Sequence, residues 1–233
     1  GDEFILNGEK MWISLATKAD YAMVTVRTLQ DADKPHQGLT NFLVDLKSPG
    51  VTVGDIHGKL GVRAGSTGWI NLQDVRVPVG NMIGEEGEGF AVSQARLAPA
   101  RLHHSMRAIG QCELLIELMY ARALERHAFG RALEGYDTVQ YAIAHSRVET
   151  EQMRLLLRKV AAQVDAMGEK SAYRDLSILK VAIAQGYYGI ADRAVQVFGA
   201  MGGYDGTPVA DAFAWSRAFR IGDGPDEVHL RSI

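Results

Sequence analysis

The turn around residue 223 holds the best candidate for acid–base chemistry in the sequence. Asp223 stands between Gly222 and Gly224, and two further carboxylates, Asp226 and Glu227, follow closely. A carboxylate can remove a proton from a substrate when it is positioned against the acidic group, and glycines let the backbone come close to a ligand. Asp is also common in glycine-rich turns for conformational reasons, so residue types alone favour a structural turn.

Other familiar catalytic and binding patterns do not fit. His103 and His104 are adjacent, so they cannot share a helical face as metal ligands, and we expect a structural or surface role for the pair. The glycines at 199–203 follow a helical pattern, which argues against a dinucleotide-binding loop. The loop at 84–89 is too acidic to cradle a phosphate by itself. Cys112 is the single cysteine, which excludes an internal disulfide and a multi-cysteine metal site; we expect no metal.

The composition is typical of a folded globular protein. Of 233 residues, 47% are hydrophobic and 23% are charged, and the net charge is −3. A nucleic-acid-binding protein normally carries a basic surplus, and no apolar run approaches the roughly 20 residues of a membrane span. A chain of this length can bury about 70% of its unfolded surface, which suffices for one large core or two smaller ones.

Residues 1–86 have the pattern of an antiparallel β domain. Asn7-Gly8 between two apolar runs predicts a tight hairpin turn that joins strands at 4–6 and 9–13. Further strands are expected at residues 21–27, 39–46, 51–56 and 69–77. Because no helix-length segment separates these strands, we expect a largely antiparallel small barrel or sandwich.

Residues 87–233 have the pattern of an up-down helical bundle. Long helices are expected at about 89–126, 139–167 and 176–200, with a short helix near 209–219. The glycines at 202 and 203 are the expected end of the third helix. Long helices with short connections favour a bundle. The sequence therefore predicts two domains, at residues 1–86 and 87–233.

Several short motifs together resemble the acyl-CoA dehydrogenase family, over its middle β domain and its C-terminal helical domain. They are the segments at 6–14, 74–78, 84–90, 125–130 and 196–199, with Arg101 and Asp223-Gly224. Each motif is weak alone, but their order and spacing are specific. The stretch 223–229, with Arg101 and the histidine pair upstream, resembles a subfamily that acts on longer or 4-hydroxylated acyl-CoA chains.

The resemblance implies FAD-dependent conversion of an acyl-CoA thioester to the 2,3-enoyl-CoA. In the family, a carboxylate removes the α-proton while a hydride leaves the β-carbon for the flavin. Asp223 matches that carboxylate, although most members have Glu. Asp is one methylene shorter, so either the backbone comes closer to the substrate, which the flanking glycines permit, or the substrate differs.

The remaining site residues are also implied by the resemblance. Trp12 and Ser14 match residues that line the flavin ring, and strand alternation would place both on one face. Arg126 and Phe129 match contacts to the pyrophosphate and adenine of FAD. Gln196 and Gly199 match a second set of FAD contacts, which a neighbouring subunit supplies in the family. Arg101 and Gly224 match positions near the substrate.

Two of these positions have structural alternatives, and two nearby carboxylates have an expected structural role. Trp12 could be a core residue at a strand end, and Arg101 could form an ion pair inside the bundle. We expect Asp226 and Glu227 to cap or solvate the next helix and so to tolerate amide substitution.

The resemblance further implies an electron-transferring flavoprotein as acceptor and a homodimer or homotetramer, in which the two FAD-binding sets meet across a subunit boundary. The implied location is the cytoplasm of a bacterium or the mitochondrial matrix of a eukaryote. Family members begin with a helical domain and a first β segment that have no match in this sequence. We therefore expect little turnover from residues 1–233 alone.

Two other functions remain open. Nitroalkane oxidase resembles the same family, binds FAD and uses Asp as its base, and oxygen consumption without an electron-accepting partner would favour it. Alternatively, the chain is a non-catalytic subunit that completes a flavin site in a hetero-oligomer, which native mass spectrometry would reveal.

Overall fold

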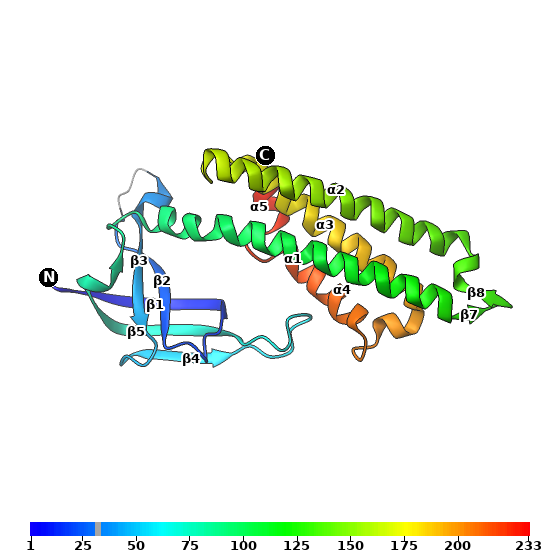
Figure 1. The fold of residues 1–233 in the computed structure, drawn as a ribbon. Helices are drawn as coiled ribbons and strands as arrows, with labels where there is room; N and C mark the ends of the chain where they lie inside the picture. The colour runs from blue at the N-terminus through cyan, green and yellow to red at the C-terminus, as the bar shows by residue number, and fades with distance from the viewer. Residues whose placement is uncertain (31–33) are drawn as a thin grey trace. The chain divides into compact units, whose positions relative to one another are not determined.

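The computed structural model describes residues 1–30 and 34–233 and divides into two compact units, Gly1–Arg96 and Leu97–Ile233 (Figure 1). The division lies within helix α1 (Gly89–Glu125), whose first turn contacts the β sheet: Asn41 Nδ2 donates to the carbonyl of Gly89 at 3.0 Å. The boundary predicted at residues 86/87 stays a prediction. In the described part of the chain, no helix is both long and apolar enough to span a bilayer.

The first unit contains two three-stranded sheets, with strand orders β1-β5-β4 and β2-β3-β6, and all their pairings are antiparallel. The strands are β1 (Glu3–Ser14), β2 (Tyr21–Arg27), β3 (Leu39–Asp45), β4 (Val51–Asp55), β5 (Thr67–Pro78) and β6 (Met82–Ile83). Apolar side chains from both sheets, including Leu6, Val24, Phe42 and Val75, form one core. The predicted antiparallel β domain is confirmed.

The hairpin predicted at Asn7-Gly8 is wrong. β1 runs straight through both residues and pairs with β5, with an irregularity in register between Leu6 and Gly8. The Asn7 amide donates to Asp74 Oδ1 at 3.1 Å, and the backbone N–H of Asp74 donates to Asn7 Oδ1 at 2.8 Å. Long-range pairing with β5 satisfies the backbone groups that a local turn would have joined, so tertiary pairing overrides the turn propensity.

The second unit is a helical bundle. Its helices are the rest of α1, then α2 (Asp137–Met167), α3 (Tyr173–Phe198), α4 (Pro208–Phe219) and α5 (Asp226–Arg231), with a small hairpin of β7 (His127–Ala128) and β8 (Arg131–Ala132) between α1 and α2. Figure 1 shows α1, α2 and α3 running lengthwise beside one another, with α4 and α5 packed against α3. The predicted bundle is confirmed.

Helix α3 forms the centre of the bundle core. Its side chains at three- and four-residue spacing are almost completely buried: Leu176, Leu179, Ile183, Tyr187, Ile190 and Ala194. The helix ends earlier than predicted, at Gly199 rather than at Gly202-Gly203. Gly199 has φ 64°, and its N–H bonds back to the carbonyls of Val195 and Gln196. The first glycine after the helix thus adopts the left-handed conformation that caps it.

Candidate active site

Asp223 lies in the turn between α4 and α5, where its side chain meets a histidine from α1. It has φ 55°, in the left-handed region, which Asp adopts more readily than most non-glycine residues. One carboxylate oxygen, Oδ2, is 2.6 Å from His104 Nδ1. The side chain of Asp223 is 21% exposed and that of His104 is 36% exposed, so a ligand can reach both.

Lys180 on α3 anchors this turn from the bundle interior. Its fully buried ammonium donates to the carbonyl of Phe219 at 2.7 Å and to that of Gly224 at 3.5 Å. The ammonium also lies 4.7 Å from the centre of the Phe219 ring. Burial lowers the pKa of Lys180, while the charges of Asp226 and Asp223 act in the opposite direction. The backbone on both sides of Asp223 is therefore held by one buried cation.

His229 on α5 supports the turn from the other end. It is 1% exposed, and its Nε2 lies 3.2 Å from the backbone carbonyl of Asp223, so Nε2–H donates this bond. Gly224 has φ +103°, and a Cβ there would come within 2.8 Å of His229 Nε2. Burial lowers the pKa of His229. Gly224 therefore matters because the turn needs both a left-handed conformation and close approach to the imidazole.

Asp226 does not solvate α5 as expected. It is 2% exposed, and its Oδ2 accepts from Arg220 Nε at 2.8 Å. The expected solvent-exposed position of Asp226 is therefore wrong. Because breaking a buried pair of this kind is costly, we expect an amide at this position to be destabilising. Glu227 is exposed, as expected.

We expect the buried His229 to make the protein less stable in mild acid. Its pKa is lowered in the folded state, so below about pH 6.5 the unfolded chain binds a proton that the folded chain does not. The free energy of unfolding should therefore fall as pH falls from about 6.5 through the folded pKa. His229→Gln, which keeps an N–H donor but does not titrate, should flatten this decline. Denaturant titrations between about pH 5 and 8 measure the free energy of unfolding. In the control His103→Gln, at an exposed position, it should fall with pH as in the parent. An equal fall in His229→Gln would contradict the role of His229.

Arg101 on α1 is buried, and within the described ranges 1–30 and 34–233 it makes no ion pair of the kind considered from sequence. It is 5% exposed, and its guanidinium carbon is 5.7 Å from the centre of the Tyr173 ring. Among the described residues, its Nε and Nη1 atoms have no hydrogen-bond partner. Unsatisfied buried donors are costly, so these atoms suit a ligand oxygen.

A cavity of about 150 Å³ opens beside His104 in the second unit. Its walls come from α1, α3 and α4, and it is lined by His104, Arg107, Gln111, Tyr187, Trp215 and Phe219, with Ala108. Arg107 lies 5.7 Å from the Trp215 ring centre. The mixture of aromatic walls and a few polar groups is typical of small-molecule sites.

Trp12 in the first unit is not a core residue. It sits at a second irregularity of β1, between the pairs Met11–Trp69 and Ile13–Gly68, with φ 62°. Its side chain is 64% exposed, and Ser14 is exposed as well. The bulge interrupts the alternation assumed from sequence, and it is the bulge that turns the indole outward.

The residues matched to the FAD adenine and pyrophosphate lie at one end of the bundle (Figure 1). Phe129, on the β7–β8 hairpin, is 99% exposed with φ 49°. Arg126 precedes this hairpin, and Gln196 and Gly199 close α3; all three are exposed. Arg122 of α1 stacks 5.6 Å from the Phe198 ring centre, which joins the two helix ends within one chain. The meeting of the two sets across a subunit boundary stays a prediction.

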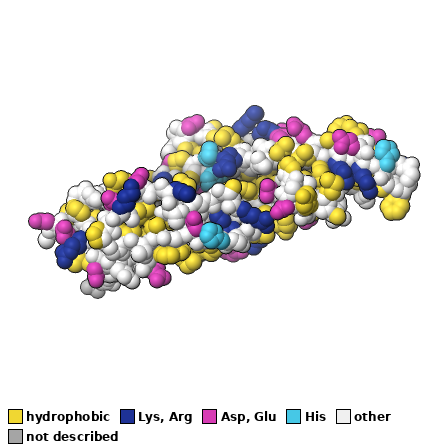
Figure 2. Space-filling model, turned by 90° about the horizontal axis from the view of Figure 1, so that it is seen from below, with side chains coloured by type: hydrophobic (Ala, Val, Ile, Leu, Met, Phe, Trp, Pro, Cys, Tyr) yellow, Lys and Arg dark blue, Asp and Glu magenta, His cyan; other side chains and the backbone are white. Residues whose placement is uncertain are grey.

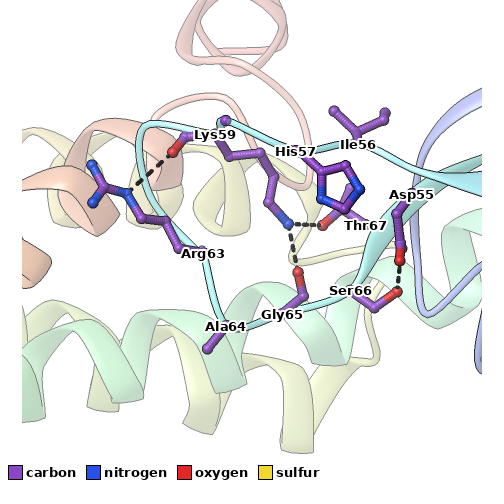
Figure 3. Close-up of a pocket in the computed structure, with 10 residues that line it drawn as sticks. Asp55, Ile56, His57, Lys59, Arg63, Ala64, Gly65, Ser66 and Thr67 are labelled. Carbon is purple, nitrogen blue, oxygen red and sulfur yellow. Dashed lines mark hydrogen bonds between the residues drawn. The ribbon is translucent and has the colours of Figure 1, made fainter.

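A larger hollow in the first unit, of about 560 Å³, contains none of the predicted site residues (Figure 3). It is formed by the loop between β4 and β5. Lys59 donates to the carbonyl of Gly65 and to Thr67 Oγ1, and Ser66 donates to Asp55. These bonds hold the loop itself together, which favours a structural role.

The face shown in Figure 2 carries Lys and Arg interspersed with Asp and Glu and with apolar side chains. Among the described residues on this face, neither sign of charge forms an extended patch. This agrees with the near-neutral composition.

Sequence reasoning missed three residues around Asp223: His104, Lys180 and His229. A signal existed for two of them. His104 lies one helical turn after Arg101, and Lys180 is the only charged residue between Leu176 and Ile183. The structural or surface role expected for the histidine pair stays a prediction; the structure adds that His104 lies 2.6 Å from Asp223.

Two family models match the chain. "Acyl-CoA dehydrogenase, middle domain" matches residues 1–75, and "Acyl-CoA dehydrogenase, C-terminal domain" matches residues 87–233. The probable acyl-CoA dehydrogenase FadE2 of Mycobacterium tuberculosis is 43% identical over the whole chain, which spans 58% of that protein. Acyl-CoA dehydrogenase family member 11 of Rattus norvegicus is 38% identical, and the chain spans 31% of it.

The fold agrees with these matches. A crystal structure of acyl-CoA dehydrogenase from Geobacillus kaustophilus superposes with a TM-score of 0.94 at 28% identity. The alignment covers all of this chain and 61% of that structure. The chain thus spans less than two thirds of each of these proteins.

Proposed function

Because this chain belongs to the acyl-CoA dehydrogenase family, we propose that it carries part of an enzyme that oxidises an acyl-CoA thioester to the 2,3-enoyl-CoA with FAD. The observation that carries the proposal is the Asp223 turn. A half-buried carboxylate is held at φ 55° by Lys180 and His229, and it faces His104. Contacts from three residues thus fix the backbone and side chain of Asp223. Such fixation suits a general base, which must be placed accurately against its substrate.

The residues present fit FAD. The bulge at Trp12 presents a planar indole to solvent, Arg126 supplies a cation suited to pyrophosphate, and Phe129 supplies an unburied aromatic ring for adenine. When bound, FAD supplies the acceptor for the substrate's β-hydride. In this proposal the Asp223 carboxylate accepts the α-proton, and the two Arg101 nitrogens that lack a partner in the described structure donate to an oxygen of the substrate.

We propose that the whole protein is a homodimer or homotetramer. The exposed apolar side chains on α1 and α2, such as Tyr120, Leu124 and Leu155, suit burial against another copy. An electron-transferring flavoprotein is the proposed acceptor. Assays with a series of acyl-CoA esters would identify the preferred acyl group, longer-chain or 4-hydroxylated.

The proposal is tested by anaerobic mixing of the purified, FAD-containing protein with acyl-CoA esters of graded length. Loss of the oxidised flavin absorbance with formation of 2,3-enoyl-CoA is the expected result. The second candidate, a nitroalkane oxidase, is favoured by the Asp at position 223. Flavin reduction by a nitroalkane but by no acyl-CoA, with oxygen consumed, would replace the first proposal by the second.

Arg126→Ala should weaken FAD binding about 10- to 100-fold, because a charge-assisted hydrogen bond contributes roughly 1.5–3 kcal/mol. Equilibrium dialysis or flavin fluorescence during reconstitution of the apoprotein measures the affinity. Arg158→Ala, on the exposed side of α2, is the matched control and should bind FAD like the parent. Unchanged affinity in Arg126→Ala would remove Arg126 from the cofactor site.

A further inference from the structure

We propose that His104 is a positioning residue for Asp223, donating its Nδ1–H to the carboxylate so that the base is oriented and ionised when substrate arrives. This inference rests on the proposed function, because it assigns a role to His104 through Asp223. The contact itself is a 2.6 Å separation between Nδ1 and Oδ2. This separation is that of an ion pair, and the proposed donation across it can come from the neutral Nδ1–H tautomer or from the imidazolium.

The turn explains why a separate support for the side chain is needed. Lys180 and His229 bind backbone carbonyls at residues 219, 223 and 224, so they fix the main chain and leave the carboxylate orientation open. His104 approaches from α1 and touches the carboxylate itself. A hydrogen bond donated to a carboxylate favours its charged form and fixes its rotamer.

The imidazole is itself held in place. Its ring centre lies 6.4 Å from that of Phe219 and 5.7 Å from that of His103, and the ring lines the 150 Å³ cavity. His104 therefore lies between the turn and this cavity. It transfers no proton in the proposed reaction, in which the α-proton passes to Asp223; bound FAD would supply the hydride acceptor.

Other charged and titratable groups surround the pair on every packed element. They are Arg101, His103 and Arg107 on α1, Lys180 and Tyr187 on α3, Arg220 after α4, and Asp226 and His229 on α5. Among them, the buried Lys180 ammonium interacts electrostatically with Asp223. Removing His104 should therefore reduce proton removal by Asp223 only in part and should not abolish it.

The test uses the FAD-containing protein and a 3-thiaacyl-CoA as the probe. This compound can lose its α-proton, but sulfur replaces the β-carbon, so no hydride can follow. The long-wavelength absorbance of its enolate against oxidised flavin therefore reports proton removal alone. The variants are His104→Ala, His104→Asn, whose amide N–H stands in for Nδ1–H, and His103→Asn as the matched control on the same helix.

We expect His104→Ala to need a clearly higher pH for half-maximal absorbance and to lower kcat roughly 10- to 100-fold at pH 7 with little change in KM. His104→Asn should recover most of both effects, and His103→Asn should match the parent. A parental pH profile in His104→Ala, or no recovery in His104→Asn, would overturn the role of His104.

A second readout needs no turnover. In protein labelled with ¹⁵N-histidine, His104 should give an Nδ1–H resonance protected from exchange, which shifts in Asp223→Asn and stays in place in Glu227→Gln. An Nδ1 without a protected proton would overturn the pairing. If instead the parent protein neither binds the probe nor is reduced by any acyl-CoA, the proposed function fails, an outcome distinct from the failure of the His104 variants alone.

Discussion

Asp223→Asn should slow reduction of the flavin by acyl-CoA about 10²- to 10⁴-fold, the usual contribution of a positioned general base. The amide keeps the shape of the side chain but cannot accept the α-proton. The backbone bonds to the turn come from Lys180 and His229 and do not use the carboxylate, so the fold should survive. FAD content and binding of a non-reducible acyl-CoA analogue should match the parent. Stopped-flow absorbance in the absence of oxygen measures the rate.

Glu227→Gln is the matched control for this prediction. Glu227 is a carboxylate in the same segment, but it is exposed on α5, and its amide should reduce at the parental rate. Asp226→Asn is unsuitable as a control, because Asp226 is buried against Arg220 and its loss would disturb the turn. A parental rate in Asp223→Asn together with a slow Glu227→Gln would show that the base has been misassigned.

Lys180→Met should lower the rate of flavin reduction about 100-fold while lowering the free energy of unfolding by only about 1–2 kcal/mol. Methionine has a similar length but cannot donate to the carbonyls of Phe219 and Gly224, which hold the turn on either side of Asp223. An unsatisfied carbonyl costs about 1–3 kcal/mol. The substitution also removes the cost of burying an ammonium, which lowers the pKa of Lys180, and this gain offsets part of the loss. The remaining effect is displacement of the base, and a shift of about 1 Å can reduce the rate about 100-fold.

Lys159→Met is the matched control, because it replaces a lysine by methionine at a position outside the contacts of the Asp223 turn. Lys159 on α2 pairs with Asp175 at 3.2 Å, but its side chain is 60% exposed, so the substitution should change stability by less than about 0.5 kcal/mol and leave the rate unchanged. Denaturant unfolding and stopped-flow reduction of both variants give the comparison. If Lys180→Met reduces flavin as fast as the parent, the buried ammonium does not position the turn.

The order of strands and helices could be predicted because it depends on local pattern. Residues 21–27 and 209–219 have the expected secondary structure nearly to the residue, since periodicity and turn residues act over short distances. The same local logic failed at Asn7-Gly8, where pairing with β5 replaced a turn of high intrinsic propensity. It also misplaced the end of α3, because three nearby glycines are equivalent in sequence and only the first takes the capping conformation.

The sequence by itself determined the two-part organisation, the family resemblance and the candidate carboxylate in the turn at 222–225. Only the tertiary structure decided what surrounds that carboxylate. His104, Lys180 and His229 lie on three different helices. Their polar atoms reach one turn because α1 and α3 share an apolar core and α5 packs against α3 with Asp226 and His229 buried. It likewise decided that Trp12 is exposed and Asp226 is buried. Periodicity records which face of an element is apolar, whereas contacts between polar side chains depend on how distant elements pack, which no local pattern records.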